Sequence, residues 1–208
     1  MSITQTTELG TCYTPEEVRA IAEHVHAKGM KLHMDGARLA NAAAHLGVPL
    51  RAFTRDAGVD ILSFGGTKNG LLFGEVVVAL NPESAHGLVY LRKMNMQLAS
   101  KMRFMSAQFI ALLEGDLWLR SASHANAMAA RLRAGVGAIP GVELTQKTES
   151  NGVFAVLPAG VADRLRKSFR FYDWNEAARE VRWMCSFDTT EDDVDSFIAA
   201  IKRELAAA

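Results

Sequence analysis

The fold is decided by the stretch VDILSFGGTKNG, residues 59–70. Its first half is a largely apolar run that predicts a buried strand, and its glycine-rich second half predicts a tight turn that carries Lys68. Upstream, KLHMDGAR (residues 31–38) has the same design, since a short apolar run ends on Asp35. Open α/β sheets bind their ligands at the carboxyl ends of strands, so both residues are expected at such an edge.

A lysine and an aspartate at strand ends are the groups that a pyridoxal phosphate site requires. The lysine forms a Schiff base with the cofactor aldehyde, and the aspartate keeps the pyridinium nitrogen protonated, so that the ring accepts electrons. Other interpretations stay open for each residue alone. Lys68 could be a solvent-exposed loop residue, and Asp35 could cap the following helix or pair with Arg38. The turn matches neither G-x-x-x-x-G-K-[ST] nor G-x-G-x-x-G, which disfavours a P-loop.

The first half of the chain alternates strands with helices. Strands are predicted at 2–4, 31–35, 59–64 and 75–80, and helices at about 14–29, 37–46 and 49–57. Thr14 is a candidate N-cap, followed by Pro15 at the first helical position and by Glu17, which completes a capping box. The alternation predicts an α/β unit with mainly parallel strands. The strand at the very start suggests that the chain begins inside a domain.

The second half predicts a different architecture. A helical region from Pro82 to about Ala138 is followed by short strands at 141–144, 152–157, 170–172 and 180–187 and by a helix at 159–168. A last helix starts after Thr190, whose acidic neighbours suit the helix dipole. We therefore expect one domain at 1–115 and a small α+β domain at 116–208. Arg182 lies inside one apolar strand, where a charge usually has a partner or a ligand.

Composition excludes several classes of protein. The 208 residues are 49% hydrophobic and 22% charged with zero net charge, as in ordinary soluble globular proteins, so neither a nucleic acid nor an anionic membrane is expected as a partner. No apolar stretch approaches the length of a membrane span. The two cysteines, Cys12 and Cys185, show neither metal spacing nor a disulfide framework, which fits a reducing cytoplasm.

Together these motifs resemble the low-specificity threonine aldolase family of pyridoxal phosphate enzymes. The resemblance rests on residues 33–38 and 63–70, supported by ELGTCYTPEE (8–17), QLASKMRF (97–104) and VRWMCS (181–186), in the order of the family. It implies the fold-type-I (aspartate aminotransferase) fold, in which a large α/β domain with a mainly parallel sheet precedes a small α+β C-terminal domain. This chain is similar to the C-terminal portion only.

The resemblance also implies residue roles. Lys68 would carry the cofactor and Asp35 would contact its pyridine nitrogen, as the catalytic pair. Arg38 would contact the cofactor or the substrate, and Thr67 would bond the phosphate or support Lys68. Arg103 would reach the cofactor phosphate of a neighbouring subunit. Arg182 would clamp the substrate carboxylate through two hydrogen bonds, a geometry that suits arginine.

The implied reaction is the cleavage of a β-hydroxy-α-amino acid such as threonine to glycine and an aldehyde, by a cytoplasmic homo-oligomer. In the family, a segment preceding the matched portion supplies a phosphate-binding Gly-Thr pair and histidines that act on the ring and as base. No histidine precedes His24 here. Two alternatives therefore remain: a catalytically silent binding or assembly module, and another fold-type-I lyase or aminotransferase.

Overall fold

The structure, a computed structural model, describes residues 1–206 and divides into two compact units. One unit comprises Met1–Thr7 and Cys12–Arg120, and the other comprises Glu8–Thr11 and the described residues from Ser121 onwards. Within the described residues, no helix is long and apolar enough to cross a membrane. Each unit has a sheet and a hydrophobic core of its own.

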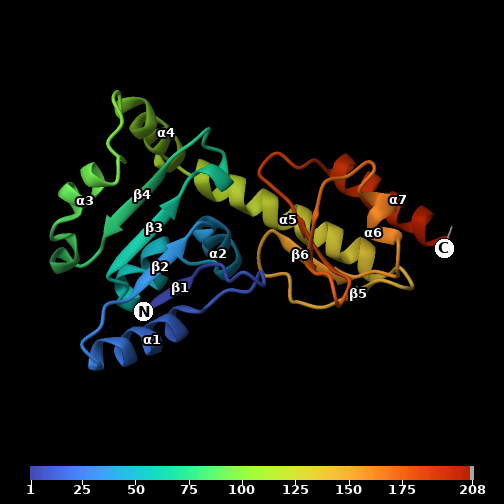
Figure 1. Cartoon of the computed structure of the whole chain (residues 1–208), viewed down its shortest axis with the longest axis horizontal. Helices are drawn as coiled ribbons and strands as arrows, with labels where there is room; N and C mark the ends of the chain where they lie inside the picture. The colour runs from blue at the N-terminus through green and yellow to red at the C-terminus, as the bar shows by residue number, and fades with distance from the viewer. Residues whose placement is uncertain (207–208) are drawn as a thin grey trace. The chain divides into compact units, whose positions relative to one another are not determined.

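The first unit contains a four-stranded sheet in the order β1 (Ser2–Thr4), β2 (His33–Gly36), β3 (Ile61–Gly65) and β4 (Glu75–Ala79) (Figure 1). The first three strands are parallel and β4 is antiparallel to β3, so the expectation of a mainly parallel α/β sheet is confirmed. The helices of this unit are α1 (Pro15–Ala27), α2 (Leu39–Leu46), α3 (Leu88–Met94) and α4 (Arg103–Leu113). Its core joins buried side chains of α1, α2, β2 and β3, among them Val18, Leu39, Met34 and Leu62.

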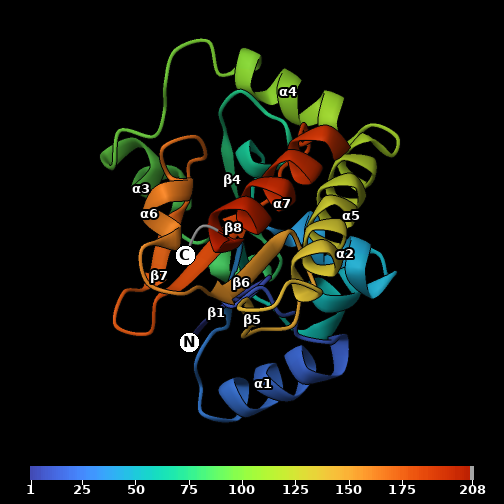
Figure 2. The same cartoon turned by 90° about the vertical axis from the view of Figure 1, so that its right-hand side faces the viewer.

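The second unit is built on an antiparallel sheet in the order β5 (Glu143–Leu144), β6 (Gly152–Val156), β8 (Glu180–Met184) and β7 (Tyr172–Asn175). Helices α5 (Leu117–Gly137), α6 (Val161–Leu165) and α7 (Glu191–Ala206) pack on it (Figure 2). Their shared core includes Leu132, Val153, Trp183 and Ile201, all nearly inaccessible to solvent. This arrangement is the expected small α+β fold.

Local sequence signals place several helix ends correctly. The Thr14 hydroxyl accepts the Glu17 amide at 3.2 Å, and the Glu17 carboxylate accepts the Thr14 amide at 2.8 Å, which confirms the capping box. Thr190 precedes α7 and accepts the Asp193 amide at 3.1 Å. The single helix expected at 49–57 is wrong. Two 3-10 turns, η1 (Leu50–Phe53) and η2 (Arg55–Ala57), stand there because Thr54 leaves helical geometry with φ −120° and ψ −95°.

A buried carboxylate fixes the ends of three strands. Asp60, 2% exposed, precedes β3 and accepts hydrogen bonds from the Leu32 amide at 2.7 Å, from His26 Nε2 at 2.8 Å and from Asn81 Nδ2 at 2.8 Å. Burial alone would raise the pKa of Asp60, but these hydrogen bonds outweigh it and lower the pKa from 3.8 to about 2. The partners come from α1, from the residue before β2 and from the chain after β4, so one side chain ties four elements together.

We expect Asp60→Asn to lower the free energy of unfolding by about 2 kcal/mol at pH 7, because the unfolded carboxyl binds protons more readily than the folded one. The contribution is complete above the unfolded pKa of 3.8 and is lost as the pH falls towards the folded pKa of about 2. The difference between variant and wild type in urea unfolding should therefore fall to about half by pH 3. The control is Asp56→Asn, which removes an exposed carboxylate paired with Arg51. A pH-independent difference for Asp60→Asn would contradict the assignment.

The turn that carries Lys68 is anchored by its neighbour. Thr67–Asn69 forms one 3-10 turn (η3), which ends at Gly70 in the left-handed region with φ +108°. The buried Asn69 side chain donates from Nδ2 to the Trp118 carbonyl at 2.9 Å. This partly buried bond fixes the turn on the first unit.

Replacing Asn69 with alanine should lower the free energy of unfolding by about 1–2 kcal/mol, since the Trp118 carbonyl loses its donor in a partly buried setting. Chemical unfolding measures this loss. Asn95→Ala is the matched control, because Asn95 makes the same amide-to-carbonyl bond with Leu91 at 2.9 Å on an exposed helix end. If the two variants lost the same free energy of unfolding, the burial of the Asn69 hydrogen bond would add nothing to its stabilising effect.

Candidate active site

The carboxyl ends of β2 and β3 form the candidate site. Asp35 pairs with Ser63 in the parallel register, so the Asp35 end of β2 lies beside the end of β3 that leads into the Lys68 turn. Asp35 is half-buried, whereas Thr67 and Lys68 are exposed. The sequence predicted a lysine and an aspartate at the carboxyl ends of neighbouring strands, and the first unit has this arrangement.

Asp35 has a backbone partner of its own. Its Oδ1 accepts the Ala37 amide at 2.9 Å, a bond that closes the turn between β2 and α2. The alternative that Asp35 caps the following helix is not what the structure has, since Arg38 occupies the N-cap of α2. Asp35 thus lies one turn before the helix, with its carboxylate at the strand end.

Glu75 joins this site, although sequence reasoning treated it only as the first residue of a strand. The pKa of the Glu75 carboxylate responds to the charges of Lys68 and Asp35 and to the side chain of Thr67. Although the residue as a whole is exposed, burial is the largest influence and raises its pKa, and Asp35 acts in the same direction against Lys68 and Thr67. The signal that could have found it is the antiparallel return of the chain, which places Glu75 opposite Gly65.

The two arginines predicted for the first unit differ in their position relative to Asp35. Arg38 lies three residues after Asp35, at the N-cap of α2, and is half-buried. Arg103, exposed at the first residue of α4, lies with its guanidinium 4.9 Å from the centre of the Phe104 ring. In the described residues, no hydrogen bond or ion pair joins Arg103 to Lys68 or Asp35.

Arg182 belongs to the second unit and has partners there. It lies in β8 between buried Val181 and Trp183, and its guanidinium is 3.5 Å from the Glu8 carboxylate and 4.8 Å from the centre of the Trp174 ring. The prediction that this charge in an apolar strand has a partner is therefore confirmed. Its role as a substrate clamp stays a prediction.

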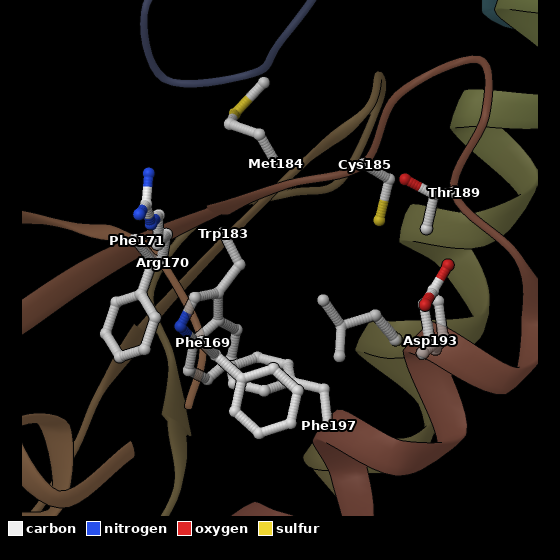
Figure 3. A pocket seen from close by; sticks show the side chains of 11 residues that line it. Phe169, Arg170, Phe171, Trp183, Met184, Cys185, Thr189, Asp193 and Phe197 are labelled. Carbon is white, nitrogen blue, oxygen red and sulfur yellow. The ribbon is translucent and has the colours of Figure 1, made fainter. Parts of the chain in front are cut away.

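The second unit also contains a cavity of about 140 Å³ (Figure 3). Its lining is mainly apolar and aromatic and includes Leu132, Phe169, Phe171, Trp183, Cys185 and Phe197. Burial raises the pKa of the Cys185 thiol to about 11, so the thiol is protonated at neutral pH and is a poor nucleophile. None of the predicted site residues lines this cavity.

The residues at the strand ends suit pyridoxal phosphate by their chemistry. Lys68 offers an amine for the cofactor aldehyde, and Asp35 offers a carboxylate for the pyridinium nitrogen. Among the described residues, no cluster of three or more histidine, cysteine or acidic side chains is placed to hold a metal ion. The lysine amine and the aspartate carboxylate at this edge of the sheet are the two groups that the organic cofactor needs.

Comparison with known proteins points to the same chemistry. Residues 1–158 match the beta-eliminating lyase family. The chain is 45% identical over 208 residues to a low specificity L-threonine aldolase of a Pseudomonas species and 42% identical to that of Pseudomonas aeruginosa. Both alignments cover 100% of this chain and 60% of the relative, so the chain spans about three fifths of the length of these proteins.

Solved structures agree. The threonine aldolase of Leishmania major superposes with a TM-score of 0.88 at 31% identity, over 97% of this chain and 60% of that one. An aromatic amino acid beta-eliminating lyase/threonine aldolase of Exiguobacterium, 16% identical with a TM-score of 0.71, shows the same fold. The fold is thus that of the fold-type-I pyridoxal phosphate enzymes, and the resemblance to the low-specificity threonine aldolases is confirmed. By the match over residues 1–158, the chain belongs to the beta-eliminating lyase family.

Proposed function

We propose that this chain is part of a threonine-aldolase-type lyase that cleaves a β-hydroxy-α-amino acid, such as threonine, to glycine and an aldehyde. The observation that carries the proposal is the placement of Lys68 and Asp35 at the ends of neighbouring strands, in a chain 45% identical to a low specificity L-threonine aldolase. When bound, pyridoxal phosphate supplies an acceptor for the electrons released as the Cα–Cβ bond breaks.

In this proposal, different residues of the chain hold different parts of the cofactor and the substrate. Lys68 holds the cofactor covalently through Nζ, and Asp35 keeps a proton on the ring nitrogen by pairing with it. Arg38 contacts the cofactor or the substrate beside the ring, and Thr67 serves the phosphate or supports Lys68. Arg103 binds the cofactor phosphate that a neighbouring subunit holds. Arg182 binds the substrate carboxylate with two parallel hydrogen bonds and so orients the bond to be broken.

The Lys68 assignment predicts which lysine reacts with added pyridoxal phosphate. Before reduction, the chain with added cofactor should show a visible absorption band, and borohydride should remove this band. Peptide mapping of the reduced chain should then find the cofactor on Lys68. Lys68→Ala should lose both, since it removes the amine that the turn after β3 carries, while Lys93→Ala on the exposed helix α3 should keep both. Uniform labelling of several lysines, unaffected by Lys68→Ala, would refute the site.

Product analysis then tests the reaction. In a protein that turns over threonine, glycine and acetaldehyde should form in equal amounts, and Lys68→Ala should lower kcat by at least about a thousandfold, because covalent attachment and cofactor orientation are lost together. A keto acid or ammonia as product would indicate an aminotransferase or a β-elimination instead. A chain that takes up no cofactor would favour a binding or assembly module.

We also propose that the protein is a cytoplasmic homo-oligomer. Among the described residues, neither Cys12 nor Cys185 forms a disulfide, and a reducing compartment keeps cysteines in this form. The first unit exposes many large apolar side chains between residues 72 and 110, among them Leu72, Val77, Val89, Tyr90, Met94, Met96 and Ile110. Exposed apolar groups in such number are typical of an interaction surface, and a second copy is the partner we assign to it.

Sedimentation velocity should accordingly show association that increases with concentration. Val89→Lys, at a position 80% exposed on a helix with no buried residue, should weaken the association at least about tenfold without unfolding the chain, because it replaces an apolar contact by a charge. Lys93→Ser on the same helix is the control and should change it little. A monomer at every concentration would overturn this part of the proposal.

A further inference from the structure

Lys68 lies on the loop that joins β3 to β4, and Glu75 is the strand residue at which this loop ends. Glu75 is the first residue of β4 and pairs with Gly65, the last residue of β3. Beside this pair, the Gly66 amide donates to the Gly74 carbonyl at 3.3 Å. The loop between them contains the Lys68 turn, which Asn69 anchors to Trp118. Glu75 is thus fixed at the base of the loop that carries Lys68.

The Glu75 side chain turns towards the strand ends. A Cβ atom on Gly65 would lie 2.9 Å from Glu75 Oε2 and 3.0 Å from the Cα atom of Ala37, so the carboxylate lies across the Gly65 backbone near the turn that follows Asp35. Any larger residue at position 65 would meet this carboxylate. Glycine at this position therefore leaves room for a second acidic group beside Asp35.

The local charges are two carboxylates and one amine. Lys68 favours the ionised form of Glu75 through its charge, and Asp35 opposes it. Glu75 and Lys68 form no ion pair among the described residues, so Lys68 acts on the Glu75 carboxylate through its charge alone. Attraction between partly exposed charges is weak enough to be released and re-formed.

We propose that Glu75 is a positioning residue that receives the side-chain amine of Lys68 whenever this lysine is not joined to the cofactor. The inference rests on the proposed function, in which Lys68 must leave the cofactor when an amino acid binds and must return afterwards. The carboxylate keeps the released ammonium beside Asp35, within reach of the place to which it returns. No covalent bond forms or breaks at Glu75, and the covalent link that changes in the proposed function is the one between Lys68 and the cofactor.

The first test needs no cofactor. In chain labelled with 13C at glutamate side chains, the titration midpoint of Glu75 should rise by at least about 0.5 pH units in Lys68→Met and fall in Asp35→Asn, since the cation and the anion act on it in opposite directions. Lys93→Met is the control and should leave the midpoint in place. A titration midpoint of Glu75 that is the same in Lys68→Met and in the wild type would overturn the inference.

The second test follows the return of Lys68 in the loaded protein. Glycine is added, then removed by rapid dilution, and borohydride quenching with peptide mapping measures how fast the cofactor reappears on Lys68. This rate should fall about threefold in Glu75→Gln and less in Glu75→Asp, which keeps the charge. Salt at about 1 M should slow the wild type towards Glu75→Gln and leave that variant unchanged, because salt screens exposed charges.

Glu23→Gln, on the exposed side of α1, is the matched control for loss of one acidic group and should behave as the wild type. Equal, salt-independent return rates in wild type and Glu75→Gln would overturn the inference and leave the proposed function standing. Failure to find the cofactor on Lys68 in the wild type itself would overturn both. Circular dichroism of Glu75→Gln and Glu75→Asp confirms that the fold is kept.

Discussion

The first unit depends on the hydrogen bonds that end on the buried carboxylate of Asp60. The Leu32 amide precedes β2, His26 closes α1 and Asn81 follows β4, so these bonds hold the amino ends of two parallel strands against their helix and their antiparallel neighbour. A buried charge is tolerated only with such partners. Because strand register is fixed along its whole length, a bond at one end of the sheet determines which residues meet at the other.

The other end of this sheet carries the candidate site. With Asp60 anchored before β3, Asp35 falls opposite Ser63, and the chain leaves β3 at Gly65. Had all strands been parallel, the site would contain only the turns that leave β2 and β3. The antiparallel β4 instead starts at this edge, and its first side chain, Glu75, enters the site. The direction of one edge strand therefore decides whether a second carboxylate joins Asp35 at this edge of the sheet.

Much of this could be predicted from the sequence. The Thr14 capping box and the Thr190 cap depend on residues within one turn, so local chemistry suffices to find them. The strand ends that carry Asp35 and Lys68 follow from apolar runs that stop at turn residues. The region of Thr54 was misjudged because a single residue outside helical geometry divides the segment, and propensity averages over such a residue. Glu75 was missed because its importance comes from pairing with Gly65, ten positions away, which no local pattern records.

Arg182 shows how a correct prediction about a charge still leaves its function open. The sequence required a partner for a guanidinium in an apolar strand, and Glu8 and Trp174 are the partners within the second unit. A carboxylate 3.5 Å away on a side chain that is 58% exposed holds the guanidinium loosely, since exposed pairs contribute about 1 kcal/mol or less. A ligand carboxylate that binds through two parallel hydrogen bonds is a stronger partner than this one. The Glu8 contact is therefore compatible with the proposed clamp, because the stacking on Trp174 can keep the guanidinium in place while its acidic partner is exchanged.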